Sequence, residues 1–282
     1  MKIRTLFIIL NIVLLLTLFS VFFLPVLILG ENLLFNQRLG ILFVISGTVF
    51  ILVLLLLNIL FFANWKILAA LENEDWPALA GLLETDIFEK KKLLKWKIRL
   101  LCIALVLLTD FETIEKLILF LQRNKPSLYR YFSPQFASLT ILSGSPARAY
   151  EIATGVLVSG YGKKNSQAAD WLRFYAAFAR HLGKYYAEAA DRFVELALNP
   201  RHHFVTAMSG YLCGVILQIY LPHRREELQK AAVCAREYVI KSYSHDHWNR
   251  TVLKFRKDVQ AVLLSRLLSE TGDWLYPDEK PC

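Results

Sequence analysis

The sequence predicts an all-α protein in which a transmembrane helical hairpin is followed by an α-solenoid. Two uncharged segments open the chain, and 55% of its 282 residues are hydrophobic, which is more than an ordinary soluble enzyme contains. Beyond them, apolar residues recur at helical spacings, and polar breaks return at intervals of about 34 to 39 residues, at 73–75, 109–110, 143–145, Gly183 and Pro222. Such a period is typical of stacked pairs of helices, and no stretch alternates in the manner of a strand.

The two uncharged segments, residues 6–30 and 39–63, are each long enough to cross a bilayer. About 20 apolar residues span the hydrocarbon core. Because only the eight residues ENLLFNQR separate the segments, the two helices must run antiparallel. We therefore assign residues 1–63 to a membrane anchor and residues 64–282 to a helical-repeat domain.

The charges that flank these segments predict their orientation. Lys2, Arg4 and Lys66 lie outside the hairpin, whereas its loop carries Arg38 together with Glu31. The positive-inside rule then places both termini in the cytoplasm and the protein in the cytoplasmic (inner) membrane as a multi-pass protein. A cleaved signal peptide is the alternative for the first segment. The second segment would still anchor the remainder.

Polar residues inside the segments are expected to bond to each other. Asn11 and Asn58 lie at membrane depth, where an amide usually finds an interhelical partner. The segments contain no ionisable residue, which argues against a channel or carrier.

A further apolar stretch, residues 204–221, has two interpretations. Its 18 residues carry no charge and contain Gly210 and Gly214 in GxxxG spacing, as a membrane span would. It is short, however, and contains Thr206, Ser209 and Gln218. We favour a buried helix whose glycines allow close packing.

Several residues predict where helices begin and end. Thr109 and Glu112 have the spacing of a capping box, and Ser145 precedes Pro146 as an N-cap would. At the other end of the chain, Gly272 and the PDEKP tail are expected to terminate the last helix.

One segment resembles a known repeat. LGKYYAEAADRFVELALNP, residues 182–200, places Gly183 at a turn, alanines and Phe193 along a helix, and Pro200 at its end. This segment resembles a tetratricopeptide repeat, although Ala189 and Phe193 fall one position late. Weaker relatives of the same turn occur in residues 70–84, 107–126 and 138–157. The whole layout is similar to that of HemY-type bacterial inner-membrane proteins. The resemblance implies a surface that binds other proteins.

A basic segment follows the second span. EKKKLLKWKIR, residues 89–99, contains six cations and one acid. Cations near an anionic inner leaflet gain about 1 kcal/mol each. We therefore consider two roles, membrane-surface binding or a solvated helix face, for Lys90, Lys91, Lys92, Lys95, Lys97 and Arg99.

Motifs for catalysis or for metal binding are missing from the sequence. His202-His203 and His245-Asp246-His247 lack ligand spacing and are expected at helix boundaries, and the four cysteines show no CxxC pair. Gly160-Tyr161-Gly162 has no preceding strand, as a phosphate loop would require. Despite an isoelectric point near 9.3, we expect no nucleic acid, small-molecule substrate or cofactor.

The helix ADWLRFYAAFARHL yields the candidate partner-binding residues. Its spacing puts Leu172, Tyr175, Ala176, Ala179 and Leu182 on an inward face. Asp170, Arg173, Ala177 and Arg180 then form a second stripe, in which Arg173 and Arg180 are placed to bind a partner's carboxylates. A plain solvated face is the alternative.

The predicted function is a membrane-anchored scaffold, not an enzyme, that binds protein partners at the cytoplasmic face of the membrane. The alternative is an accessory subunit or enzyme of a membrane-associated pathway with an unrecognised site.

Overall fold

The structure is a computed structural model that describes residues 3–29, 37–160, 166–256 and 258–277, and every regular element in these ranges is helical. The all-α prediction is therefore confirmed. The chain divides into two compact units, unit 1 (residues 1–104) and unit 2 (residues 105–282). Several predicted features, namely Lys2, Glu31, the 161–165 loop and most of the PDEKP tail, lie outside the described residues.

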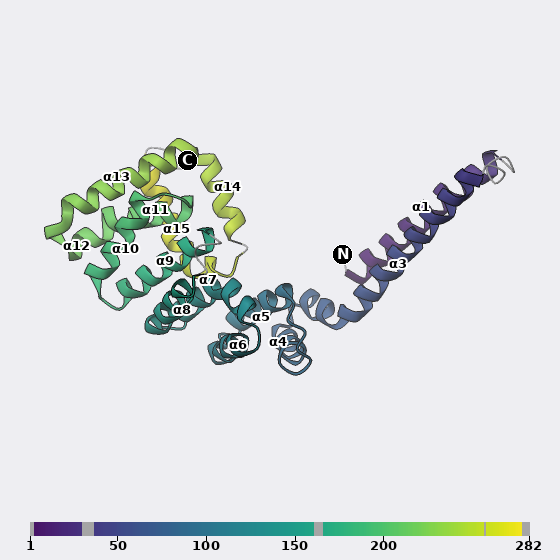
Figure 1. Ribbon diagram of the computed structural model, residues 1–282, viewed down its shortest axis with the longest axis horizontal. Helices are drawn as coiled ribbons and strands as arrows, with labels where there is room; N and C mark the ends of the chain where they lie inside the picture. The colour runs from purple at the N-terminus through teal and green to yellow at the C-terminus, as the bar shows by residue number, and fades with distance from the viewer. Residues whose placement is uncertain (1–2, 30–36, 161–165, 257, 278–282) are drawn as a thin grey trace. The chain divides into compact units, whose positions relative to one another are not determined.

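Unit 1 begins with two long helices, α1 (Ile3–Leu29) and α3 (Gln37–Glu72), which lie side by side (Figure 1). The amide of Asn58 donates to Oδ1 of Asn11 over 2.8 Å, which confirms the predicted bond between the helices. Phe7 and Phe61 stack with ring centroids 3.5 Å apart. Unit 1 continues with α4 (Trp76–Glu84), a π-helical turn (Thr85–Glu89) and the start of α5 (Lys95–Leu107).

Among the described residues, two helices are long and apolar enough to cross a membrane by length and composition. One is Ile45–Glu72, whose most apolar part is 0% buried, and the other is His203–Tyr220, whose most apolar part is 61% buried. Burial of this degree supports the interpretation of 204–221 as a core helix.

From α6 to α11, unit 2 is a succession of helices in which each packs against the next. Figure 1 shows α7, α8, α9, α10 and α11 following one another in this way. In addition, α9 contacts both α7 and α11, and α10 contacts α13. The elements are α6 (Phe111–Asn124), α7 (Pro126–Leu142), α8 (Pro146–Val158), α9 (Ser166–Leu182), α10 (Tyr186–Leu198), α11 (His203–Tyr211), a π-helical turn (Leu212–Leu217), α12 (Gln218–Tyr220), a 3-10 turn (Pro222–Arg224), α13 (Arg225–Ser242), α14 (His245–Phe255) and α15 (Ala261–Leu275).

Four of the predicted breaks are turns of one design. In each, a residue with positive φ follows a helix: Glu74, Thr109, Gly144 and Lys184. The next residue donates its backbone N–H, over 2.9 Å, to the carbonyl five positions earlier; the pairs are Asp75 to Ala70, Asp110 to Leu105, Ser145 to Thr140 and Tyr185 to Arg180. This is the Schellman closure, which satisfies carbonyls at a helix end. The internal period is therefore visible in the backbone, with the turns 35, 35 and 40 residues apart.

One predicted cap is corrected, and the position of another is confirmed. Thr109 occupies the turn itself, and its hydroxyl donates to the carbonyl of Leu108. Asp110 caps α6 instead, because its carboxylate accepts from the backbone and hydroxyl of Thr113 over 3.0 and 2.8 Å. Ser145 is the N-cap residue of α8, but its side chain makes no capping hydrogen bond.

The prediction for Gly272 is wrong, since α15 runs through this residue to Leu275. A Cβ at position 272 would lie 3.0 Å from the Trp248 indole nitrogen. The glycine is therefore a packing residue inside the helix, where α14 approaches α15.

Gly210 and Gly214 allow α13 to approach the helical segment 203–217 closely. A Cβ at Gly210 would lie 2.6 Å from that of Ala235, and one at Gly214 would lie 2.7 Å from that of Ala232. Both alanines belong to α13, and Trp274 of α15 lies against the same glycines. The predicted role of these glycines in close packing is confirmed.

Adding a methyl group at these glycines should destabilise the protein. We expect Gly210→Ala to lower the free energy of unfolding by about 1 to 3 kcal/mol, because the core has no room for the extra atom. Gly155→Ala is the matched control, since Gly155 is also helical and a Cβ added there would meet nothing within 4 Å. That control should be neutral or stabilise by about 0.5 to 1 kcal/mol. Chemical denaturation followed by circular dichroism measures both; equal effects would contradict the packing argument.

Candidate functional site

The predicted charged stripe of α9 is not an open surface. Asp170 is 3% exposed and Ala177 is fully buried, because α9 packs against α7, α8, α10 and α11 at once. Asp170 accepts a hydrogen bond from Arg173 over 3.1 Å, and burial raises the pKa of its carboxyl. The inward face is confirmed for Leu172, Tyr175, Ala176 and Ala179. Leu182, however, ends the helix and is exposed.

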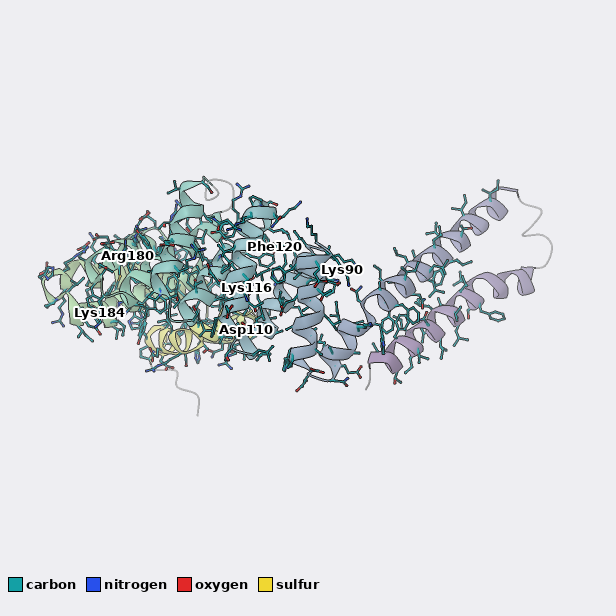
Figure 2. The ribbon with its side chains drawn as sticks, turned by 90° about the horizontal axis from the view of Figure 1, so that it is seen from below. Lys90, Asp110, Lys116, Phe120, Arg180 and Lys184 are labelled. Atoms are coloured by element: carbon teal, nitrogen blue, oxygen red, sulfur yellow. The ribbon has the colours of Figure 1, made fainter. Side chains whose placement is uncertain are left out.

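Arg180 is held by neighbours within unit 2. Its guanidinium lies 3.9 Å from the ring centroid of Tyr150 and 4.8 Å from that of Tyr185, and it pairs with Glu188 over 3.1 Å. A cation between two aromatic faces is attracted by both. Figure 2 labels Arg180 and Lys184, which lie at the same end of this unit. Arg180 thus fixes the turn between α9 and α10, which leaves little of its charge for a partner.

Near this turn, several apolar side chains at the end of α9, at the start of α10 and in α12 are exposed or half-buried, and we call this set the tyrosine patch: Leu182, Tyr185, Tyr186, Ile219 and Tyr220. Tyr186 and Tyr220 stack with centroids 4.1 Å apart, and His181 lies within 6.1 Å of Tyr220. The patch therefore joins the end of α9, the start of α10 and α12. Ile219 is 73% exposed and Tyr185 is 55% exposed. Tyrosine-rich apolar surface of this kind is enriched at protein interfaces.

The row formed by α7, α9 and α11 is covered by the chain's own last helix, α15. Contacts join α15 to α7 and to α11. The hydroxyl of Tyr175 in α9 donates to Oε1 of Gln260, just before α15, over 2.7 Å. Tyr211 of α11 likewise bonds to Glu270 over 3.1 Å. The last helix thus returns to pack on helices from the start of unit 2, which the sequence did not predict.

Between α9, α11 and α14 lies a cavity of about 320 Å³, which we call the histidine cavity. Trp171 lines the cavity, stacked on Phe255 at 5.6 Å and edge-on to His202 at 5.3 Å between ring centroids. The remaining lining residues are Gln167, Arg201, His203, Phe204, Tyr243 and Thr251. The structure therefore brings the His202-His203 pair into a cavity, although the sequence placed it only at a helix boundary.

The two imidazoles of the histidine cavity are neutral at physiological pH. Burial lowers the pKa of His202 to about 4, and burial also lowers the pKa of His203. Their Nδ1 atoms are buried without a hydrogen-bond partner. A neutral imidazole offers one donor and one acceptor, so the cavity suits a polar group carried on an aromatic or apolar molecule.

In the basic segment of unit 1, one lysine is buried and the other cations are exposed. Lys97 is 3% exposed and binds the carboxylate of Asp86, which also accepts from Lys90 over 2.9 Å. The prediction that Lys97 faces a membrane surface is therefore wrong. Lys91, Lys92, Lys95 and Arg99 are exposed. Hydrogen bonding to Lys97 lowers the pKa of Asp86, so this carboxylate stays ionised between its two lysines.

Within the described parts of the chain, no three His, Cys, Asp or Glu side chains gather in a way that holds a metal ion. Cys102 and Cys213 are buried and Cys234 is half-buried, and no disulfide joins these three cysteines. Burial raises the pKa of Cys213 to about 12, so this thiol is unsuited to nucleophilic chemistry.

The low pKa of His202 predicts a dependence of stability on pH. Between pH 6.5 and about 4 the unfolded chain binds a proton that the folded chain does not, so stability should fall as the pH falls through this window. From pH 7 to pH 5 the loss attributable to His202 is at most about 2 kcal/mol. We expect His202→Gln to remove that part of the loss in urea titrations at the two pH values.

The matched control for this experiment is His223→Gln, because His223 is exposed. It should keep the pH dependence of the unaltered protein. If His202→Gln also keeps the full pH dependence of stability, the claim that His202 is buried and neutral in the folded protein is contradicted.

Comparison with known proteins places the chain in a protein family. A family model described as "Uncharacterised Treponema protein" matches residues 113–277. The chain is also similar to an uncharacterised protein of Treponema pallidum (strain Nichols), with 29% identity over 238 residues, which are 81% of this chain and 74% of that protein. No solved structure matches. The resemblances to tetratricopeptide repeats and to HemY-type proteins therefore stay predictions. Since the matched region is more than half of the chain and extends from the first turn of α6 to the end of α15, the chain belongs to this Treponema protein family.

Proposed function

We propose that this protein is a membrane-anchored helical scaffold, in which α1 and α3 hold unit 2 at the cytoplasmic face of the inner membrane and the tyrosine patch binds a protein partner. The observation that carries the proposal is the tyrosine patch, an exposed aromatic surface on a helical unit whose other broad face is already covered by α15. Tyrosine is among the residues that contribute most to binding energy at protein interfaces.

The anchoring part of the proposal is supported by the surface of the hairpin. Apolar side chains point outward along both helices, including Leu16 at 60% and Phe62 at 69% exposure. Exposing so much apolar surface to water is energetically unfavourable, whereas contact with lipid tails removes this surface from water. The amide of Asn58 is satisfied by Asn11 and by the carbonyl of Leu54, as burial in lipid requires.

The binding part of the proposal is supported by the rigidity of the patch. The stacked pair of Tyr186 and Tyr220 and the Arg180 ion pair fix the turn that carries Tyr185. A preorganised aromatic surface loses little conformational entropy on binding. Lys184, exposed at the same turn, adds a positive rim that favours an acidic border on the partner.

Site-specific cross-linking in cell membranes tests the proposal. A photoreactive residue at Ile219 should cross-link to a discrete partner. Tyr185→Ser combined with Tyr220→Ser should reduce the yield about tenfold or more, because truncating two interface anchors costs about 2 kcal/mol or more.

The matched control truncates two exposed apolar residues away from the patch, Val158→Ser and Val262→Ser. It should leave the cross-link unchanged. Equal cross-linking in the tyrosine variant and in the unaltered protein would reject the patch as the binding site.

The histidine cavity favours a second candidate function, an accessory subunit or enzyme of a membrane-associated pathway. Its polar groups converge on an aromatic-lined space, which is the usual form of a small-molecule site. A cross-link that survives loss of the patch tyrosines but disappears with Trp171→Ala would support this second candidate over the first.

A further inference from the structure

The segment that follows the π-helical turn and continues into the first turns of α5 presents cations and apolar side chains together. Lys91, Lys92 and Arg99 are exposed, and so are Leu94 at 49% and Trp96 at 44%. A soluble helix normally turns its large apolar residues inward, and here two of them project among charges. This mixture is typical of a surface that meets lipid headgroups and the outermost part of the acyl chains.

Asp86 fixes the position of this segment. Its carboxylate binds Lys90 at one end of the segment and Lys97 near the other. The backbone carbonyl of Asp86 also accepts from the N–H of Lys92 over 2.8 Å. Lys91 has a positive φ of 53°, so the chain turns sharply between the two lysines that Asp86 holds. The buried carboxylate of Asp86 thus pairs with two lysines of the segment, while other cations of the segment remain exposed. Lys90, labelled in Figure 2, marks the start of the segment.

We propose that residues 91–99 bind the anionic phospholipid headgroups of the membrane that the hairpin occupies, with Leu94 and Trp96 entering the interface. This inference rests on the proposed anchoring function. Charge complementarity selects anionic lipid as the occupant, because exposed lysine and arginine near a bilayer are attracted to acidic headgroups. Tryptophan is enriched at the boundary between headgroups and hydrocarbon.

The position of the segment in the chain supports the same occupant. The uncharged run of α3 ends at Ala63, and Trp65 and Lys66 follow as interfacial residues. Residues 91–99 belong to the same compact unit as this part of α3. The side-chain bonds of Lys90 and Lys97 to Asp86 fix the segment against the π-helical turn, so its shape does not depend on contact with a membrane.

The test uses the full chain in lipid nanodiscs, with an environment-sensitive fluorophore on Leu94→Cys and with Cys234 and Cys282 replaced by serine. Discs contain either phosphatidylcholine alone or phosphatidylcholine with phosphatidylglycerol. We expect a blue shift of the emission in the anionic discs only. The shift should be lost on charge reversal at Lys91, Lys92 and Arg99, and also in high salt, where the Debye length falls to about 3 Å at 1 M.

Two controls accompany the experiment. A fluorophore on Val262→Cys reports on an exposed site of unit 2 and should not respond to lipid charge. Charge reversal at Lys184, Lys230 and Arg250, which are exposed residues of unit 2, should leave the Leu94 signal intact.

The outcomes separate the two proposals. Failure of the chain to co-elute with any disc would overturn the anchoring function. Co-elution with an emission that is the same in neutral and anionic discs, or that survives charge reversal at Lys91, Lys92 and Arg99, would overturn the lipid-binding segment alone.

Discussion

The packing of α15 across α7, α9 and α11 decides what the rest of unit 2 can do. Trp274 of α15 lies beside Gly210, where an added methyl group would collide with Ala235 of α13 and crowd the Trp274 ring. Tyr175 is fully buried at this contact and bonds to Gln260, so separating the helix would leave polar groups unpaired in the core. Because α15 packs on α7 and α11, we look for the proposed binding surfaces at the ends and edges of the helices. The tyrosine patch and the histidine cavity both lie there.

In the chain, the region between α3 and unit 2 contains a small charge network centred on Asp86. Asp86, almost buried, neutralises two of the six cations of the 89–99 segment and thereby orients the others. Burying a carboxylate without a partner costs free energy of desolvation, and pairing with the two lysines offsets this cost. The same arrangement explains why Trp96 and Leu94 remain outside. A membrane surface accounts for the exposed cations and the exposed apolar residues together, which a purely aqueous setting does not.

Local rules predicted much of the fold from particular residues. The breaks at 73–75, 109–110, 143–145 and 183 are turns, and Asn11 bonds to Asn58, because backbone geometry and amide pairing are set by a few neighbouring residues. The errors concern burial. Asp170 and Ala177 were placed on a surface, since helical periodicity shows that faces differ but does not show that four neighbours surround α9. The return of α15 and the cavity at His202 are contacts between distant residues, such as Trp171 with Phe255, and no local pattern encodes them. The amphipathic spacing of Leu264, Leu268 and Leu275 signalled that α15 packs, without indicating where.

The central claim is that the hairpin holds the helical unit at the cytoplasmic face of the membrane, and the location of the C-terminus tests it most directly. Alkaline phosphatase, which is active only outside the cytoplasm, and green fluorescent protein, which is fluorescent only inside, can each be fused after residue 282. The account predicts a fluorescent and phosphatase-negative fusion, because Lys2, Arg4 and Lys66 keep both ends of the hairpin inside. An active phosphatase at this position would contradict it.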